Sequence, residues 1–164
     1  MPYAGTAVDF FSNPSTAYAA TPGSSALSKI QKNQSIIEGI IAKDAKYGAK
    51  YTVYELYEVD KDGKEKVKYV GRTRQNINER LTQHEKSDPN KKGLETRIAE
   101  QDGKRLTGLT YSEGRGLESV VYEKRIKQEG KLLNRIKPID LSELGKETKK
   151  GMKAAEYLKK LRNF

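Results

Sequence analysis

The stretch 50–71, KYTVYELYEVDKDGKEKVKYVG, decides the fold of this chain. Its first ten residues are rich in β-branched and aromatic side chains, which favour a strand. The DKDG sequence at 60–63 is a strong turn signal, and a second strand is predicted over 66–71. The stretch therefore predicts a β-hairpin, with Tyr54 on its first strand and Tyr69 on its second.

Helices and one further strand are predicted around this hairpin. The helices are expected over 26–44, 76–86, 117–129 and 141–162, and the strand over 106–111. The EGRG sequence at 113–116 is interpreted as the break before the third helix. Together these elements predict an α+β fold, with a small antiparallel or mixed sheet of about three strands flanked by helices and extra N- and C-terminal helices.

Four segments are predicted along the chain. Residues 1–25 are interpreted as a flexible linker or junction, because Asp9 is the only charged side chain among the first 28 residues and small polar types dominate the rest. An N-terminal helical extension is expected over 26–48 and a folded domain over 49–140. A basic C-terminal helix is expected to fill 141–164.

The charge of the chain favours a polyanionic partner. Its 32 basic and 22 acidic residues give a formal net charge of +10. Nucleic acid is the first candidate, since neutralising phosphates releases counterions, and an anionic membrane surface is the second. The chain has no cysteine and a single histidine, which excludes disulfides, thiolate metal sites and multi-histidine sites within one chain. No apolar run approaches the ~18 residues of a membrane helix, so no membrane insertion is expected.

Arg80 and His84 lie four residues apart on the predicted helix over 76–86, so they share one of its faces. A guanidinium can bind two phosphate oxygens, and a neutral imidazole can exchange a proton near neutral pH. Helical spacing places the pair beside the apolar Ile77 and Leu81, at the rim of the core, where a cleft would lie. A solvated helix face is the commoner explanation of such a pair taken alone.

Two tyrosines and a glutamate complete the candidate set. The phenols of Tyr54 and Tyr69 on paired strands could approach one another and relay a proton from water, although tyrosine also suits strands for packing alone. Glu118 opens the predicted helix over 117–129, where one carboxylate could hold a hard divalent ion together with waters and a substrate phosphate. The helix dipole alone also favours an acidic residue there.

The order and spacing of these residues resemble the GIY-YIG nuclease family over about residues 50–138. The matching residues, in chain order, are Tyr54 in TVY, Tyr69 in YVG, Arg80, His84, Glu118 and Asn134. Thr52 and Val53 replace the glycine and isoleucine of the first motif. The resemblance makes 49–140 a GIY-YIG-like nuclease domain.

The resemblance implies a divalent-metal-dependent endonuclease that uses Mg²⁺, or Mn²⁺, bound by Glu118. Tyr54 would act as a general base that passes its proton to His84, and Arg80 would hold the scissile phosphate. The implied catalytic residues are Tyr54, Tyr69, Arg80, His84 and Glu118, and the implied substrate contacts are Gly71, Arg72, Thr73 and Asn134. DNA is favoured over RNA as the substrate. An RNA- or tRNA-cleaving toxin of the same fold and a non-catalytic nucleic-acid-binding module are the alternatives.

The organisation of the chain also resembles the toxin tips of bacterial polymorphic secreted systems, which are short basic nuclease domains behind a low-complexity junction. This resemblance implies a secreted effector that acts in the cytoplasm of a target cell and has an immunity protein as its partner. A phage-encoded or repair nuclease that stays in the cytoplasm has the same sequence features.

Overall fold

The computed structural model describes the chain from Ser24 to Phe164, so the predicted linker at 1–25 lies outside the described residues except for its last two. The chain divides into two compact units, residues 1–35 and 36–164. The predicted N-terminal helix is confirmed as α2 (Ser24–Tyr47), which contributes to both units. None of the described helices is long and apolar enough to span a membrane.

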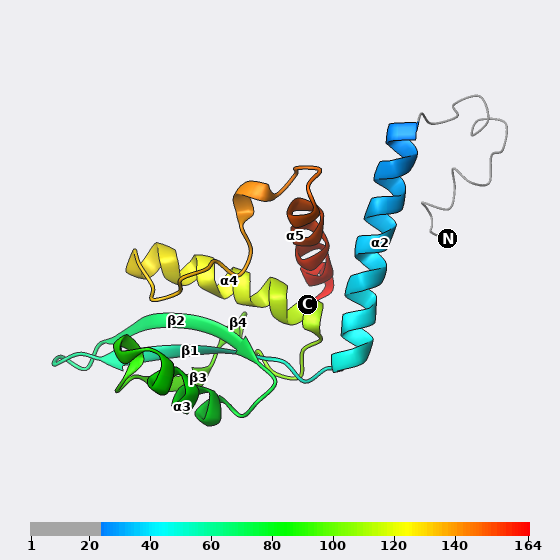
Figure 1. Cartoon of the computed structure of the whole chain (residues 1–164). Helices are drawn as coiled ribbons and strands as arrows, with labels where there is room; N and C mark the ends of the chain where they lie inside the picture. The colour runs from blue at the N-terminus through cyan, green and yellow to red at the C-terminus, as the bar shows by residue number, and fades with distance from the viewer. Residues whose placement is uncertain (1–23) are drawn as a thin grey trace. The chain divides into compact units, whose positions relative to one another are not determined.

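A three-stranded antiparallel sheet forms the centre of the unit 36–164 (Figure 1). Its order is β2-β1-β3, with bounds β1 (Thr52–Val59), β2 (Glu65–Thr73) and β3 (Glu95–Ile98). The predicted hairpin and the α+β class are confirmed. The register places Tyr54 opposite Gly71 on one side and Ile98 on the other. The central strand of the sheet therefore carries the tyrosine of the first predicted motif.

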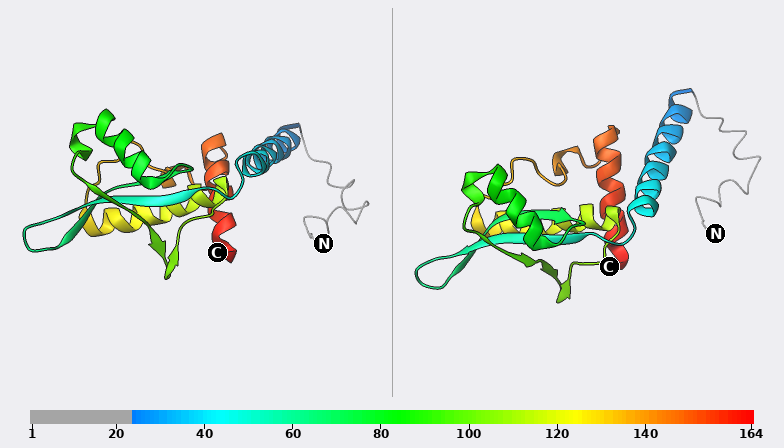
Figure 2. Two further views of the ribbon diagram at one scale, coloured as in Figure 1. Left: turned by 90° about the horizontal axis from the view of Figure 1, so that it is seen from below. Right: turned by 60° about the horizontal axis from the view of Figure 1, so that its bottom comes forward.

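One helix covers each face of the sheet, α3 (Ile77–Ser87) on one side and α4 (Tyr111–Glu129) on the other, as two views agree (Figures 1 and 2). Side chains alternate along a strand, so β1 contributes to two separate cores. Tyr54 and Leu56 pack with the residues of α3, whereas Val53 packs with those of α4. The Asn76 side chain caps α3, as predicted, by accepting a hydrogen bond from Asn78 N.

The helix α4 begins six residues earlier than predicted, and the predicted break at 113–116 is wrong. Thr110 and Glu113 form a capping box at its start. Glycines cost helix stability, but here they allow close packing. A Cβ on Gly114 would lie 3.2 Å from Tyr51 Cβ, and one on Gly116 would lie 2.8 Å from the Tyr157 carbonyl oxygen.

The third strand is not the predicted one. The prediction of a strand over 106–111 is wrong, because that segment makes only a single bridge, between Leu109 and Tyr51, before α4 begins. Strand β3 comes instead from a charged stretch, and it is followed by the two-residue strands β4 (Glu100–Gln101) and β5 (Lys104–Arg105). Pairing with β1, not intrinsic preference, makes β3 a strand.

The predicted C-terminal helix is interrupted. It consists of the 3₁₀ turn η3 (Leu141–Glu143), the helix α5 (Lys149–Lys159) and the 3₁₀ turn η4 (Lys160–Asn163). Gly145, with φ of +87°, lies between η3 and α5. Ala154 and Tyr157 of α5 are buried in the same core as α4. The tail is therefore packed on the sheet-covering helix.

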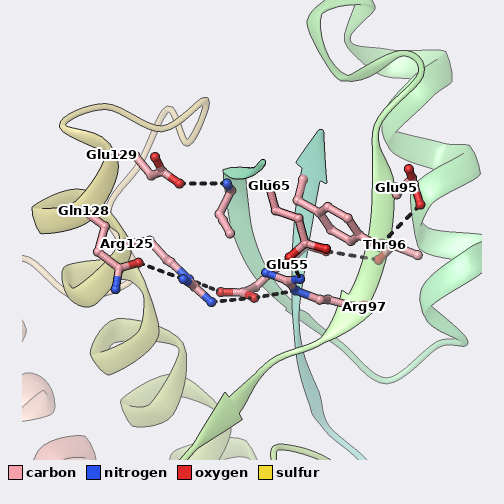
Figure 3. Close-up of polar contacts among 10 residues, drawn as sticks. Glu55, Glu65, Glu95, Thr96, Arg97, Arg125, Gln128 and Glu129 are labelled. Atoms are coloured by element: carbon pink, nitrogen blue, oxygen red, sulfur yellow. Dashed lines mark hydrogen bonds and ion pairs between the residues drawn. The ribbon is translucent and has the colours of Figure 1, made fainter. Parts of the chain in front are cut away.

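A buried ion-pair network joins α4 to the sheet (Figure 3). Glu55 of β1 is 2% exposed, and both of its carboxylate oxygens accept hydrogen bonds. Arg125 Nε lies 2.5 Å from Oε2 and its second nitrogen, Nη2, 3.1 Å from Oε1, while Arg97 Nε of β3 lies 3.1 Å from Oε1. Two guanidinium groups thus satisfy one carboxylate on the α4 face of the sheet.

Candidate active site

Tyr54 and His84 make a buried hydrogen bond on the α3 face of the sheet. Tyr54 Oη lies 2.6 Å from His84 Nε2, and the His84 side chain is buried. The register explains how the phenol reaches across β2. A Cβ on Gly71 would lie 2.7 Å from Tyr54 Oη, so only glycine leaves room for that hydroxyl. Gly71, predicted as a substrate contact, makes room here for a neighbouring side chain.

Tyr69 and Lys91 pack around the same histidine. The ring of Tyr69 meets that of His84 edge-on, with centroids 4.7 Å apart. The 3₁₀ turn η2 (Pro89–Lys91) follows α3 and brings Lys91 Nζ to 4.0 Å from the Tyr69 ring centroid and 3.3 Å from His84 Nδ1. Sequence analysis missed Lys91, because nothing in its local sequence separates it from the other basic residues.

The contact with Lys91 sets the direction of the Tyr54–His84 hydrogen bond. An ammonium group has donors only, so His84 Nδ1 accepts from Lys91. In a neutral ring the proton then resides on Nε2, which donates to Tyr54 Oη. The expected transfer of a proton from Tyr54 to His84 is therefore not the resting arrangement. The hydroxyl proton of Tyr54 is left to point away from the ring.

Burial controls the protonation of this pair. It lowers the pKa of His84 to about 4, aided by the positive charges of Lys91 and Arg80, so the ring is neutral at physiological pH. Burial also raises the pKa of Tyr54 well above its usual value, followed by the effect of Tyr69, whereas Arg80 opposes the rise. The resting pair is thus a protonated phenol and a neutral imidazole.

A basic pocket of about 330 Å³ opens beside the pair. Tyr69 and His84 line it together with three cations and a carboxylate, namely Arg80, Lys91, Arg135 and Asp88. Asp88 Oδ2 lies 3.8 Å from Lys91 Nζ and 3.9 Å from Arg135 Nη2. Because one carboxylate faces three cations, the pocket keeps an excess of positive charge. It suits a phosphate group.

Glu118 is buried on α4 and forms an ion pair with β2. Its Oε1 lies 2.6 Å from Arg72 Nη1. Burial raises the pKa of Glu118, and the charge of Arg72 opposes that effect. Glu118 is the eighth residue of α4, so the prediction that it opens the helix is wrong, and the dipole at the helix start does not account for it.

The carboxylate of Glu118 affects one residue of the pocket through its charge. It does not line the pocket, yet its charge is, after burial, the next cause of the raised pKa of Tyr69. The structure thus brings Tyr54, Tyr69, Arg80 and His84 together, and the charge of Glu118 on α4 acts on Tyr69.

Three of the predicted substrate contacts are bonded within the protein. Arg72 is paired with Glu118, and Thr73 Oγ1 accepts a hydrogen bond from Gln75 N at 3.0 Å. The amide of Asn134 accepts from Val70 N at 3.1 Å and donates to Val70 O at 2.7 Å. Asn134 thereby fastens its segment to the edge of β2, and contact of these residues with substrate stays a prediction.

The donor set bears on the predicted metal ion. Among residues 24–164, no three His, Cys, Asp or Glu side chains gather into a group that could hold a metal. Glu118 offers a single hard carboxylate. Such a set fits an ion held mainly by water and phosphate oxygens, as Mg²⁺ prefers, and it does not fit a cage of protein ligands.

Comparison with known families assigns the chain. A model of the GIY-YIG catalytic domain matches residues 50–137, which is more than half of the chain and includes the tyrosines, Arg80, His84 and Glu118. No curated protein and no solved structure matches the chain. The chain belongs to the GIY-YIG family. This is a family of nucleases, so nucleic acid is the class of substrate.

Proposed function

We propose that this chain is an endonuclease that hydrolyses DNA with the help of a divalent ion, Mg²⁺ or Mn²⁺, at Glu118. The observation that carries the proposal is the 2.6 Å contact between Tyr54 Oη and His84 Nε2 beside the basic pocket. A buried phenol held by a neutral imidazole is a group that can exchange a proton, and three cations next to it can hold a phosphate.

Tyr54 is the proposed general base. When it gives up its own proton to solvent, the resulting phenolate is stabilised by the Nε2–H of His84 and by the charge of Arg80. It can then accept a proton from the attacking water. His84 acts as a hydrogen-bond donor in this scheme, and Lys91 keeps it in the donating tautomer.

Positive side chains would meet the negative charge that develops on the phosphate. Arg80, Lys91 and Arg135 line the pocket and would bind its non-bridging oxygens. A divalent ion held by Glu118, water and the substrate would supply further positive charge against the developing oxyanion. Arg72 would keep the Glu118 carboxylate ionised and in place through the ion pair at 2.6 Å.

Cleavage assays test this proposal. Supercoiled plasmid and total RNA are incubated with the purified chain, with Mg²⁺ and with chelator. We expect metal-dependent nicking or linearisation of the plasmid by the parent chain and by Glu123→Gln, a control on the same helix. Glu118→Gln, which keeps an oxygen for Arg72, should be inactive.

The results separate the alternatives. Cleavage of RNA but not of plasmid would replace DNA with RNA as the substrate. Tight binding of both nucleic acids without cleavage of either would identify a non-catalytic binding module. Equal cleavage by Glu118→Gln and the parent chain would refute the role of Glu118.

We also propose that the nuclease serves as a secreted antibacterial toxin that acts in the cytoplasm of the target cell and is restrained by an immunity protein. A small, basic nuclease domain behind a segment poor in charged residues supports this role. Induced cytoplasmic expression in a bacterium should stop growth for the parent chain and not for Glu118→Gln. Normal growth with the active parent chain would argue for a cytoplasmic repair or phage nuclease.

A further inference from the structure

A second basic pocket, of about 340 Å³, lies between α4, α5 and the segment that links them. Four cations line it, namely Arg115, Lys137, Lys150 and Lys153, against one carboxylate, Asp140. Most of its lining follows residue 137 and so lies beyond the part of the chain that matches the family. Apart from Ile136, none of its lining residues lines the catalytic pocket.

The positive charge of this pocket is poorly compensated. No salt bridge to Arg115 is found within residues 24–164. Its Nη2 donates to the Pro138 carbonyl at 3.1 Å, its guanidinium carbon lies 5.1 Å from the Tyr157 ring centroid, and its buried Nε has no hydrogen-bond partner among those residues. Asp140 already accepts a hydrogen bond from the Ser142 hydroxyl at 2.6 Å. Burial and then the charge of Lys149 lower the pKa of Lys153, as expected where cations crowd together. An anion would relieve that repulsion.

Ile136 belongs to the lining of both pockets and connects them. Its side chain is 83% exposed, more than any other large hydrophobic side chain in the described part of the chain. An isoleucine left in water forgoes the favourable burial of its side chain. An exposed apolar side chain between two basic pockets suits a ligand that alternates phosphates with flat apolar surfaces.

The segment that presents Ile136 is held at both ends. Before it, Asn134 makes two hydrogen bonds to the backbone of Val70. After it, Pro138 accepts the hydrogen bond from Arg115, and Ile139 is 5% exposed in the core. The exposed side chain is therefore carried by a fixed segment.

We propose that the bound nucleic-acid strand continues from the catalytic pocket over Ile136 into the second basic pocket, which binds a further phosphate of the same strand. Ile136 packs against a base between the two phosphates and unstacks it from its neighbour, as apolar side chains do in some DNA complexes. This inference rests on the proposed nuclease function and adds the path of the substrate. Residues of the C-terminal helix thereby contribute to substrate binding.

Salt-dependent binding tests the second pocket. The affinity of the full chain for a fluorescein-labelled 20-base-pair DNA duplex is measured in chelator at several salt concentrations. Removing one phosphate contact should lower the slope of log affinity against log salt by about 0.9. We expect this change in the double variant Lys137→Ala/Lys150→Ala. The control Lys61→Ala/Lys64→Ala removes the same charge from the β1–β2 turn and should leave the slope unchanged.

A base analogue tests Ile136. Duplexes with 2-aminopurine at successive positions around the cleavage site should show increased fluorescence at one position with the parent chain, because an unstacked base is no longer quenched. Ile136→Ala should lose this signal and lower kcat/KM roughly three- to tenfold, in keeping with the loss of one buried apolar contact. Ile41→Ala, which truncates another exposed isoleucine, should keep both the signal and the rate.

Failure of the path differs from failure of the nuclease proposal. Suppose that the parent chain cleaves DNA but Lys137→Ala/Lys150→Ala keeps the salt slope of the parent chain, as the control does. The path is then wrong and the nuclease function stands. The same conclusion follows if Ile136→Ala keeps the fluorescence signal. If the parent chain neither binds nor cleaves the duplex, both proposals fail.

Discussion

Two buried glutamates connect the sheet to α4, and they are bonded to different extents. Glu55 lies on the sheet and forms an ion pair with Arg125 of the helix. Glu118 lies on the helix and forms an ion pair with Arg72 of the sheet. Residues 118 and 125 are seven apart, about two turns, so both pairs lie along one face of α4. The helix thus contributes an acidic residue to one ion pair and, about two turns further on, a basic residue to the other.

The number of partners distinguishes the two carboxylates. Both oxygens of Glu55 are taken by two guanidinium groups, whereas Glu118 has one oxygen bonded to a single guanidinium. A fully bonded carboxylate can only hold the structure together. A carboxylate with one arginine retains the capacity to bind something else, and that is the physical reason to assign Glu118 to chemistry and Glu55 to stability.

The largest difference between the two glutamates should be the effect of their substitution on the cleavage rate. Glu118→Gln should lower the cleavage rate about 10³-fold, equivalent to about 4 kcal/mol, because it removes the carboxylate charge proposed to hold the divalent ion at the phosphate. Its melting temperature should fall less than that of Glu55→Gln, since only one arginine loses its negative partner and Arg72 keeps an oxygen to bond. Plasmid cleavage and a melting curve measure the two quantities, and a large fall in melting temperature would assign Glu118 to the structure instead.

The next effect should be on stability. Glu55→Gln leaves two arginines without their negative partner and should lower the free energy of unfolding by about 3 kcal/mol. Urea denaturation measures this loss. Below the melting temperature, cleavage per folded molecule should be unchanged. A loss of cleavage as deep as that of Glu118→Gln would abolish the distinction between the two glutamates.

Acid should weaken the α3 face of the sheet through His84. Its pKa is about 4 in the folded chain, below its usual 6.5, so the unfolded chain binds the proton more readily. Stability is therefore complete above pH 6.5 and falls as the pH drops toward 4, by about 2 kcal/mol between pH 7 and 5. Urea titrations at both pH values should show a smaller difference for His84→Gln, and an equal difference would contradict the assignment.

The smallest effect concerns the two helix–sheet arginine contacts. Arg125→Lys cannot bond both oxygens of Glu55 and should cost about 1 kcal/mol of stability. Arg72→Lys replaces a single contact from Nη1 and should cost less than about half of that. Paired urea titrations measure both, and equal losses would show that the number of contacts does not decide the energy.

The sequence predicted those parts of the site that depend on local order. The hairpin and α3 follow from strand-forming residues, a strong turn and a capping asparagine, and together they bring Tyr54, Tyr69 and His84 into contact. Their chemical roles remain predictions.

Long-range contacts account for most of what the sequence did not predict. The start of α4 was misplaced because two glycines suggest a break, although Thr110 and Glu113 carry a readable capping signal. The partner of Glu118 and the place of Lys91 beside His84 depend on packing between elements distant in sequence. No periodicity within a single element reports such contacts.

Gly116 has a consequence for how this protein can be divided. The backbone of Tyr157 in α5 lies so close to it that a methyl group there would be 2.8 Å from the carbonyl oxygen. The family match ends at residue 137, while the helix that carries Glu118 packs against a segment beyond that residue. A graft that moved only 50–137 into another protein would omit α5 and would expose to solvent the side of α4 that α5 covers. The stretch that matches the family and the stretch that packs into one core are here two different lengths of chain.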